Sequence, residues 1–223
     1  MGLRRSLISV VDGEGTGLKM LTVDRIKNCT EVLGPGKRFA VWFHGCRRNC
    51  HGCIAAEMNA SSDYECYTPE QLLERVRNVS EVEGITVSGG EPFDQPREEL
   101  EFFLHGVVSH GLNVMAYTGY LREELENDVQ AQRLLRHVDI LIDGPYRESE
   151  DHGELWRGSG NQRVHFLTDR YRDLEGSVMK RKGRPLEVEL GADRSFAFSG
   201  VPPRGFREKL RSALAERQME LNW

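Results

Sequence analysis

The sequence has no long apolar segment and no excess of basic residues, and each absence removes a class of function. No run of about 18 apolar residues occurs in the 223-residue chain, so no membrane-spanning helix is expected. The formal net charge is −5, which offers no broad basic surface for nucleic acid. The two arginines near the start precede no apolar stretch, so no secretory signal peptide is predicted. A cytoplasmic protein is expected.

Cysteines are few, and their odd number argues against a disulfide framework. There are five, at positions 29, 46, 50, 53 and 66, in a chain without an export signal. Cys29 and Cys66 have no partner by spacing and are predicted to be ordinary thiols. The other three lie within eight residues of one another, which is too close for chance. They are the first candidates for chemistry.

Internal repeats and low-complexity segments are also absent, and short apolar runs alternate with amphipathic ones. The runs predicted to be buried strands are 39–43, 84–88, 112–117, 138–142 and 163–167. Between them, Thr68 and Gln71 predict a capping box, and apolar stripes predict helices over 100–108 and 121–135. This alternation predicts an α/β fold of parallel, right-handed βα units.

The two ends of the chain depart from this alternation. Residues 1–170 are predicted to be the core, of which residues 1–37 are a lead-in with weaker signals. Its possible strands are Leu7 to Val11 and Met20 to Ile26. Residues 171–223 are predicted to be a small C-terminal hairpin-plus-helix appendage. Its expected elements are an exposed loop around 175–185, hairpin strands at 186–190 and 195–199, and a helix over 206–214.

Cys46, Cys50 and Cys53 form a C-x3-C-x2-C pattern directly after the strand predicted at 39–43. Thiolates are the ligands of iron–sulfur clusters, and three of them would leave the fourth iron of a cubane without a protein ligand. An open coordination position is what a catalytic metal site requires. The pattern therefore favours a catalytic [4Fe-4S] cluster.

Simpler interpretations of the cysteines stay open. A structural zinc ion would need a fourth ligand, for which His44, His51 or Cys66 could serve. A C-x-x-C redox pair of Cys50 and Cys53 would leave Cys46 without a role. The C-x-x-C-H signature of haem attachment is missed by one residue.

Polar groups and bare backbone follow three of the predicted strands. Gly89-Gly90-Glu91-Pro92 follows the strand at 84–88, and two glycines there let a ligand approach the backbone. Thr118 and Asp143 also stand at strand ends, where ligands of α/β folds bind. Simple turns are the alternative at each of these positions. Planar donors within 156–163 predict a carboxylate site, a pocket closure or a solvated loop.

Together the cysteine loop and the Gly-Gly-Glu-Pro segment resemble the radical S-adenosylmethionine superfamily. Within it, the chain is most similar to the small anaerobic ribonucleotide-reductase activating proteins and their single-cluster relatives, over roughly residues 20–170. The further segments that carry this similarity are 34–38, 117–120, 143–146 and 155–163.

The resemblance implies an incomplete (β/α) barrel, open on one side, whose cluster is held by Cys46, Cys50 and Cys53 as the catalytic centre. S-adenosylmethionine would chelate the remaining iron, and its reductive cleavage would give a 5′-deoxyadenosyl radical. The residues implied to contact this cofactor are Gly52, Ile54, Gly89, Gly90, Glu91, Thr118 and Asp143. Gly52 departs from the superfamily, where many members carry an aromatic residue, but a small residue is familiar in this subgroup.

The resemblance also implies partners. A flavodoxin- or ferredoxin-type protein would supply the electron, and a glycyl-radical protein such as anaerobic ribonucleotide reductase would lose the hydrogen atom. The same chemistry on a small molecule or peptide is the alternative, which the C-terminal appendage favours because it could cover the open side of the barrel. A non-catalytic zinc or iron–sulfur binding module is a third interpretation.

Overall fold

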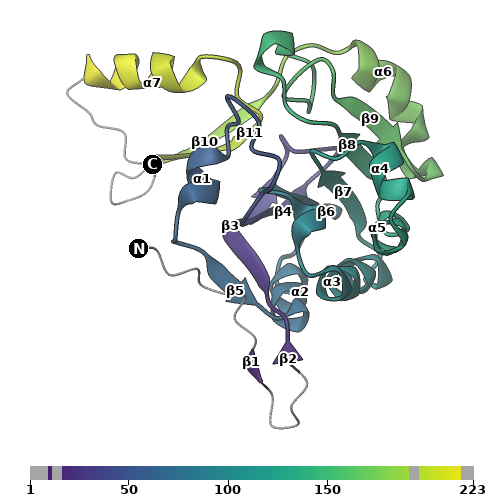
Figure 1. Cartoon of the computed structure of the whole chain (residues 1–223). Coiled ribbons are helices and arrows are strands. Elements are labelled where there is room, and N and C mark those ends of the chain that lie inside the picture. Colours follow the sequence, from purple (N-terminus) through teal and green to yellow (C-terminus); the bar gives the residue numbers. More distant parts are fainter. Residues whose placement is uncertain (1–9, 12–16, 191–195, 217–223) are drawn as a thin grey trace.

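The computed structural model describes residues 10–11, 17–190 and 196–216. Its main sheet has seven strands in the order β5-β3-β4-β6-β7-β8-β9 (Figure 1). Their bounds are β3 Leu21–Thr30, β4 Arg38–Phe43, β5 Glu65–Tyr67, β6 Gly84–Gly89, β7 Asn113–Tyr117, β8 Ile140–Asp143 and β9 Arg163–Phe166. The central strands β4, β6, β7 and β8 run parallel to one another. The predicted α/β class is confirmed.

Helices α1 to α5 lie in the connections between the parallel strands, whereas α6 and α7 follow β9. The helices are α1 Ala56–Ala60, α2 Pro69–Arg77, α3 Arg97–Ser109, α4 Arg122–Glu126, α5 Val129–Leu135, α6 Glu175–Lys180 and α7 Phe206–Ala215. Short 3-10 helices span Pro92–Asp94, Glu148–Glu150 and Asp169–Leu174. The predicted capping box is confirmed, because Thr68 Oγ1 accepts from Gln71 N and Gln71 Oε1 accepts from Thr68 N. None of the described helices is long and apolar enough to cross a membrane.

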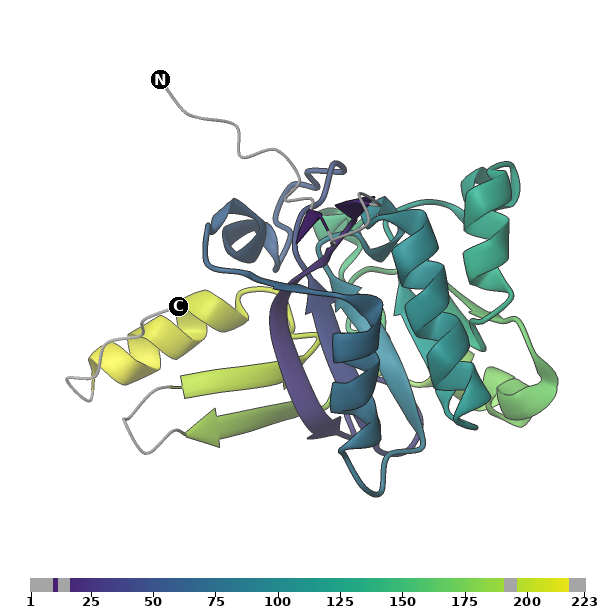
Figure 2. The ribbon, with the colours of Figure 1, turned by 90° about the horizontal axis from the view of Figure 1, so that it is seen from below.

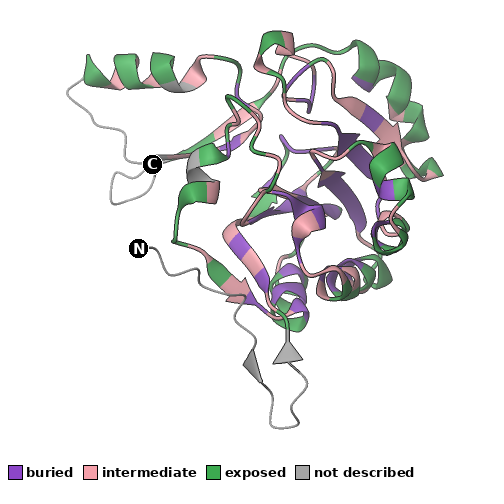
Figure 3. Cartoon of the chain, viewed as in Figure 1, coloured by how far each residue is buried: buried purple, intermediate pink, exposed green. Residues whose placement is uncertain are grey.

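The side chains of strand β4 pack on both faces of the sheet. All six of its residues are buried. Phe39, Val41 and Phe43 belong to the cluster that also holds the apolar faces of α2 and α3. Ala40 and Trp42 alternate with them and pack on the opposite side with Val201. Because strand side chains alternate, one face of the sheet is the helix-covered core and the other can line a cavity. Figure 3 shows the buried central strands and the exposed outer helix faces.

Three sequence predictions about elements are wrong. The helix predicted over 121–135 is two helices, since Asp128 caps α5, and Val129 is exposed. Strand β9 runs antiparallel to β8, because the connection between them contains no α-helix to carry the chain back. The loop expected to begin at 175 starts with helix α6 instead, and Val178 of α6 is buried against Ile140 and its neighbours.

The lead-in residues match the prediction in part. The strand expected from Met20 to Ile26 is β3, which continues to Thr30 and runs antiparallel to β4. Val10–Val11 form β1, which pairs with β2, Gly17–Leu18. The rest of the strand expected at 7–11 lies outside the described residues. The open barrel and the domain boundary at residue 170 stay predictions.

Arg38 gives the segment 34–38 a structural role. Its side chain is fully buried beneath the non-helical face of the sheet. Its Nε donates to Thr86 Oγ1 over 2.6 Å, and its Nη1 donates to Asn113 Oδ1 over 2.7 Å and to the Pro35 carbonyl over 3.0 Å. Burial lowers the pKa of this guanidinium to about 10. Arg38 therefore ties strands β4, β6 and β7 together at the end away from the cysteines.

The C-terminal hairpin is a separate two-stranded sheet, β10 Leu186–Leu190 paired with β11 Phe196–Gly200. Ser195, the first residue of the predicted second strand, lies outside the described residues. Figures 1 and 2 place the hairpin beside β3, on the face of the sheet that the helices leave open. Glu187 fixes this position: its carboxylate accepts from Thr30 Oγ1 over 2.8 Å and pairs with Lys27 Nζ over 2.9 Å.

Candidate functional site

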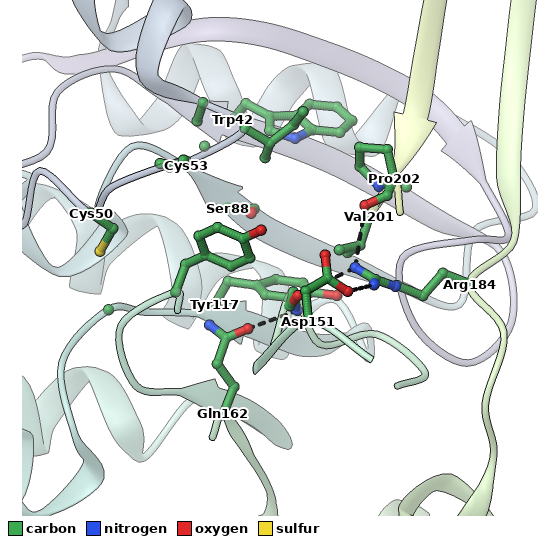
Figure 4. A pocket seen from close by; sticks show the side chains of 18 of the residues that line it. Trp42, Cys50, Cys53, Ser88, Tyr117, Asp151, Gln162, Arg184, Val201 and Pro202 are labelled. Carbon is green, nitrogen blue, oxygen red and sulfur yellow. Dashed lines mark hydrogen bonds and ion pairs between the residues drawn. The ribbon is translucent and has the colours of Figure 1, made fainter. Parts of the chain in front are cut away.

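One cavity of about 750 Å³ lies at the carboxyl ends of the parallel strands. Trp42, Ser88 and Tyr117 come from adjacent strands at one level, since Trp42 pairs with Ser88 and Val87 with Ala116. The cysteine loop lines one end, and the C-terminal hairpin lines the other. Figure 4 shows Cys50 and Cys53 on one side and Arg184, Val201 and Pro202 on the opposite side. Its volume falls in the range of small-molecule sites, roughly 300–1,000 Å³.

All three motif cysteines line this cavity and are half-buried. Their loop folds on itself, because Cys53 N donates to the Cys50 carbonyl and Arg48 N donates to Cys46 Sγ over 3.4 Å. Burial raises the pKa of the Cys46 thiol. A bound metal would offset that cost, because it stabilises the thiolate directly.

Backbone bonds hold the base of the cysteine loop from the side of β6. Gly90 N donates to the Phe43 carbonyl over 2.7 Å, and Glu91 N donates to the Gly45 carbonyl over 2.8 Å. The approach is so close that a Cβ on Gly90 would lie 2.1 Å from the Gly45 oxygen. Gly89 has a φ of +96°, which favours glycine. The two glycines are therefore required by packing against the cysteine loop.

The buried carboxylate of Glu91 joins two strand ends. Glu91 is 1% exposed, and its Oε1 accepts from Thr118 Oγ1 over 2.8 Å and from Phe93 N over 3.1 Å. Its Oε2 accepts from Gly119 N over 2.7 Å. Burial raises the pKa of Glu91 to about 7, although these donors act in the opposite direction. Glu91 and Thr118 thus fix the cavity wall between β6 and β7.

The raised pKa of Glu91 predicts a pH-dependent loss of stability. The Glu91 carboxyl has a pKa of about 7 in the folded protein, whereas in the unfolded chain its pKa is near the ordinary value of 4.5. The stabilising contribution of Glu91 is therefore fully present below the unfolded-state pKa of 4.5, and it is lost as the pH rises through the folded-state pKa of about 7. We expect the stability of the parent relative to Glu91→Gln to fall between pH 5 and pH of about 7.5. Urea unfolding of both proteins across this range measures it, and a pH-independent difference would contradict it.

The structure brings most of the sequence-predicted cofactor residues to one place. The members that line the cavity are Gly52, Ile54, Gly89, Gly90, Glu91 and Thr118. Ile54 is 41% exposed, and Gly52 has a left-handed φ of +71°. A Cβ on Gly52 would also lie 3.2 Å from the Glu148 carboxylate carbon. A glycine in place of the superfamily's usual aromatic residue therefore has a local cause.

Asp143 stands apart from this group. It ends β8 but is absent from the residues that line the cavity. Its oxygens accept from Arg122 N over 2.7 Å and from Arg163 Nε over 3.0 Å, and His165 Nε2 lies 3.2 Å away. These partners hold the pKa of Asp143 well below its usual range despite burial. In this structure the carboxylate fastens β8, β9 and the start of α4.

The planar donors within 156–163 mainly stabilise their own loop. Gln162 lines the cavity, but its Oε1 accepts from Gly158 N over 2.7 Å and its Nε2 donates to the Gly144 carbonyl. Asn161 Nδ2 donates to the Pro145 carbonyl over 2.8 Å. Arg163 pairs with Glu123 and Asp143. Of the predicted alternatives, this geometry favours closure of the pocket.

The sequence indicated that the C-terminal appendage could cover the open side of the core, but it did not indicate that Arg184 belongs to the resulting wall. Arg184 falls in the segment predicted to be an exposed loop, yet its side chain is 3% exposed. Its guanidinium pairs with Asp151, whose side chain is equally buried, and Nη1 donates to the Pro202 carbonyl over 3.2 Å. The prediction is wrong here because Gly183 N bonds to the Gly153 carbonyl and draws the segment onto the core. The run of basic residues around Arg184 did not indicate in the sequence that Arg184 would pair with Asp151.

Asp151→Ala is expected to release the hairpin without unfolding the core. It would leave a buried guanidinium without its carboxylate, which costs roughly 3 kcal/mol, or about a hundredfold in the opening equilibrium. Hydrogen exchange of the amides in β10 and β11 should accelerate accordingly. Asp169→Ala is the control, since it removes an exposed partner of Arg172 and should change nothing measurable. Unchanged exchange in Asp151→Ala would show that the pair does not hold the hairpin.

The donor set fits an iron–sulfur cluster. All five cysteines are among the described residues, and none of them forms a disulfide. The three on the loop are soft sulfur donors that face one cavity, as a cluster with an exposed corner requires. Among the described residues, no three His, Cys, Asp or Glu side chains converge on a single-ion site.

Comparison with known proteins adds independent information. Residues 32–165 match the family model described as a 4Fe-4S single cluster domain. The anaerobic ribonucleoside-triphosphate reductase-activating protein of Enterobacteria phage T4 is 32% identical over 154 residues, covering 67% of this chain and 96% of the relative. Those of Vibrio cholerae and Haemophilus influenzae are 31% and 30% identical, each covering 61% of this chain and 92% of the relative.

The match begins just before β4 and ends within β9, so it includes the cysteine loop, the Gly-Gly-Glu segment and Thr118. It stops before the hairpin and α7. The iron–sulfur interpretation of the cysteines is thereby favoured over a structural zinc ion. The chain belongs to the 4Fe-4S single-cluster family that includes the anaerobic ribonucleoside-triphosphate reductase-activating proteins.

Proposed function

We propose that this protein is a radical S-adenosylmethionine enzyme that generates a radical on a partner. The strongest support is that the three cysteines and the Gly-Gly-Glu backbone line the same cavity. Cys53 and Gly89 are 36 residues apart in the sequence. Cys46, Cys50 and Cys53 would hold the [4Fe-4S] cluster. When bound, the cluster supplies the electron that breaks the C5′–S bond, giving methionine and a 5′-deoxyadenosyl radical that abstracts hydrogen.

The cofactor would lie against backbone that side chains leave bare. Gly90 and its neighbours Gly89 and Glu91 form that surface, with Gly52 and Ile54 on the side of the cysteines. Asn59 Oδ1 and Tyr117 Oη are among the buried polar atoms without hydrogen-bond partners in the described part of the chain. Asn59 Oδ1 would lie 2.7 Å from a Cβ on Gly90, where resemblance places the methionyl amino group. An unused acceptor there fits an ammonium donor.

In this proposal Thr118 and Asp143 act on the cofactor indirectly, by positioning other residues. The Thr118 hydroxyl donates to Glu91, so Thr118 orients the wall and offers only its remaining acceptor capacity to the cofactor. Asp143 would steady the strand ends through Arg163. The surrounding sheet would act as an incomplete (β/α) barrel that limits water at the reacting atoms.

The partner would be a glycyl-radical protein of the ribonucleotide-reductase type. This is supported by the relatives, which are named anaerobic ribonucleoside-triphosphate reductase-activating proteins. A flavodoxin- or ferredoxin-type protein would supply one electron for each cofactor cleaved. Hydrogen transfer from a glycine Cα would leave 5′-deoxyadenosine and a glycyl radical.

The test is anaerobic reconstitution followed by turnover. We expect about four irons and four sulfides per chain, and 5′-deoxyadenosine formation with a strong reductant. Electron paramagnetic resonance of a co-incubated glycyl-radical reductase should then show a carbon-centred radical. Colourless protein with one zinc ion per chain would contradict the proposal.

A second candidate substrate is a small molecule or peptide. The observation that favours it is the C-terminal hairpin, which lines the cavity and lies outside the family match. A wall at this position limits the size of the substrate that can reach the cluster, which favours a small molecule or peptide. Genes next to this one separate the candidates: a glycyl-radical protein favours activation, and a biosynthetic cluster favours a small substrate.

A further inference from the structure

The cavity continues well beyond the cysteine end. Its far end is lined by Phe198, Val201 and Pro202 from the hairpin and the segment after it. Arg25 reaches this end, since its Nη1 donates to the Phe198 carbonyl, and Figure 4 shows Trp42 between Cys53 and Pro202. Figure 4 shows Val201 and Pro202 across the cavity from Cys50. The hairpin side of this end lies outside residues 32–165, so the family match does not account for it.

Arg25 is a cation whose binding capacity is only partly used. Its guanidinium carbon lies 3.9 Å from the centre of the Trp42 ring, and Nη1 donates to the Phe198 carbonyl over 2.9 Å. Its Nε is buried and has no hydrogen-bond partner among the described residues. Burial lowers the pKa of Arg25, because desolvation disfavours the charged guanidinium.

No carboxylate of the described residues forms an ion pair with Arg25. Glu189 is the acidic group that acts on it electrostatically, but the Glu189 carboxylate pairs with Lys27 Nζ over 2.9 Å. The other arginines of the cavity lining differ in this respect. They pair within the described residues as Arg48 with Glu124, Arg184 with Asp151 and Arg204 with Glu148.

The lining acids offer no compensation either. Glu91 uses both oxygens on Thr118, Phe93 and Gly119, and Glu208 is exposed on α7. Arg25 contacts the Trp42 ring and the Phe198 carbonyl. A partly buried cation with unused donors is stabilised most by an anion that accepts from it in a fork geometry. No anion paired with Arg25 in such a fork is provided by residues 17–190 and 196–216.

We propose that the far end of the cavity is a substrate subsite for a carboxylate group on an apolar body, with Arg25 as the residue that receives the anion. Trp42, Val201 and Pro202 contact the apolar body, and Arg184 and Asp151 hold the hairpin wall in place. The subsite rests on the proposed function only in that hydrogen abstraction takes place at the cysteine end. The anion would belong to a free acid or to an acidic side chain of an entering peptide segment.

The experiment compares acids with their uncharged amides. The probes are 4-phenylbutyrate against 4-phenylbutyramide, and a capped Phe-Asp-Phe peptide against its Asn counterpart. Binding to the anaerobically reconstituted full chain is measured by calorimetry. We expect at least one acid to bind roughly tenfold to a hundredfold more tightly than its amide, as charged hydrogen bonds allow. The acid with the larger preference identifies the source of the anion.

Variants assign the preference to Arg25. Arg25→Gln should bring the acid and the amide to within about twofold of each other, and Arg25→Lys should keep a reduced preference. Arg75→Gln is the matched control, since it removes an exposed guanidinium that lies over the Tyr67 ring, outside the cavity. Arg75→Gln should retain the full preference. Circular dichroism establishes that each variant is folded.

Three outcomes would overturn the subsite: equal binding of both acids and their amides to the parent, full acid preference in folded Arg25→Gln, or loss of S-adenosylmethionine affinity in Arg25→Gln with acid preference unchanged. The last would place Arg25 in the cofactor half. Failure of the proposed function is a separate result. It would appear as parent protein without iron or without cofactor cleavage, whatever the acid and amide comparison gives.

Discussion

Replacing any one of the three loop cysteines is expected to abolish cluster binding. Cys50→Ala should fall from about four irons per chain to near background after anaerobic reconstitution, because a cubane held by two thiolates is exposed and labile. The visible absorption of the cluster and the formation of 5′-deoxyadenosine should disappear with the iron. Iron analysis, absorption spectra and product chromatography measure the three effects.

The chain supplies its own controls for this experiment. Cys29 is exposed at the end of β3, and Cys66 is half-buried on β5; neither lines the cavity. Cys29→Ala and Cys66→Ala should therefore keep the iron content and turnover of the parent. The cluster assignment fails if the loop variants load as much iron as these controls.

Adding one methyl group at Gly90 is expected to displace the cysteine loop. The new Cβ would lie 2.1 Å from the Gly45 carbonyl oxygen, which is itself held by Glu91 N. Removing this steric clash requires the backbone to move in the segment that leads into Cys46. Gly90→Ala should cost about 3 kcal/mol of folding free energy, the upper end for overpacking, and should reduce cluster loading severely.

A substitution at a second glycine tests whether the steric clash causes the effect expected for Gly90→Ala. Gly176 lies in α6 with no atom within 4 Å of an added Cβ. Gly176→Ala should be neutral or stabilising by about 0.5–1 kcal/mol, since alanine suits a helix better. Thermal unfolding and iron content of both variants make the comparison. Equal stability of Gly90→Ala and the parent would show that the loop is not clamped there.

Much of the site could be predicted because its signals are local. Cys46, Cys50 and Cys53 share one loop, and Gly89, Gly90 and Thr118 follow strands whose apolar runs are plain in the sequence. Parallel strands end at the same edge, so residues at their carboxyl ends meet without further information. The capping box at Thr68 and Gln71 is likewise a short-range pattern, and it is confirmed.

The errors arose where distant segments decide the environment. The direction of β9 depends on a connection that lacks a helix, which an apolar run of four or five residues cannot reveal. Arg184 was expected in solvent because basic residues usually are, but Asp151 lies 33 positions away in sequence and buries it. Asp143 stays a predicted cofactor residue, and its oxygens contact Arg163 and His165, which the sequence did not indicate.

The amino-acid sequence by itself determined the α/β class, the position of the cysteine loop and the glycines opposite it, since each follows from spacing along a single element or strand end. Only the tertiary structure decided which residues of the C-terminal appendage line the far end of the cavity, and that no carboxylate of the described residues forms an ion pair with Arg25. Charge compensation is a property of neighbours in space, and the neighbours of Arg25 come from β4 and from β11, more than 170 residues away in the case of Phe198.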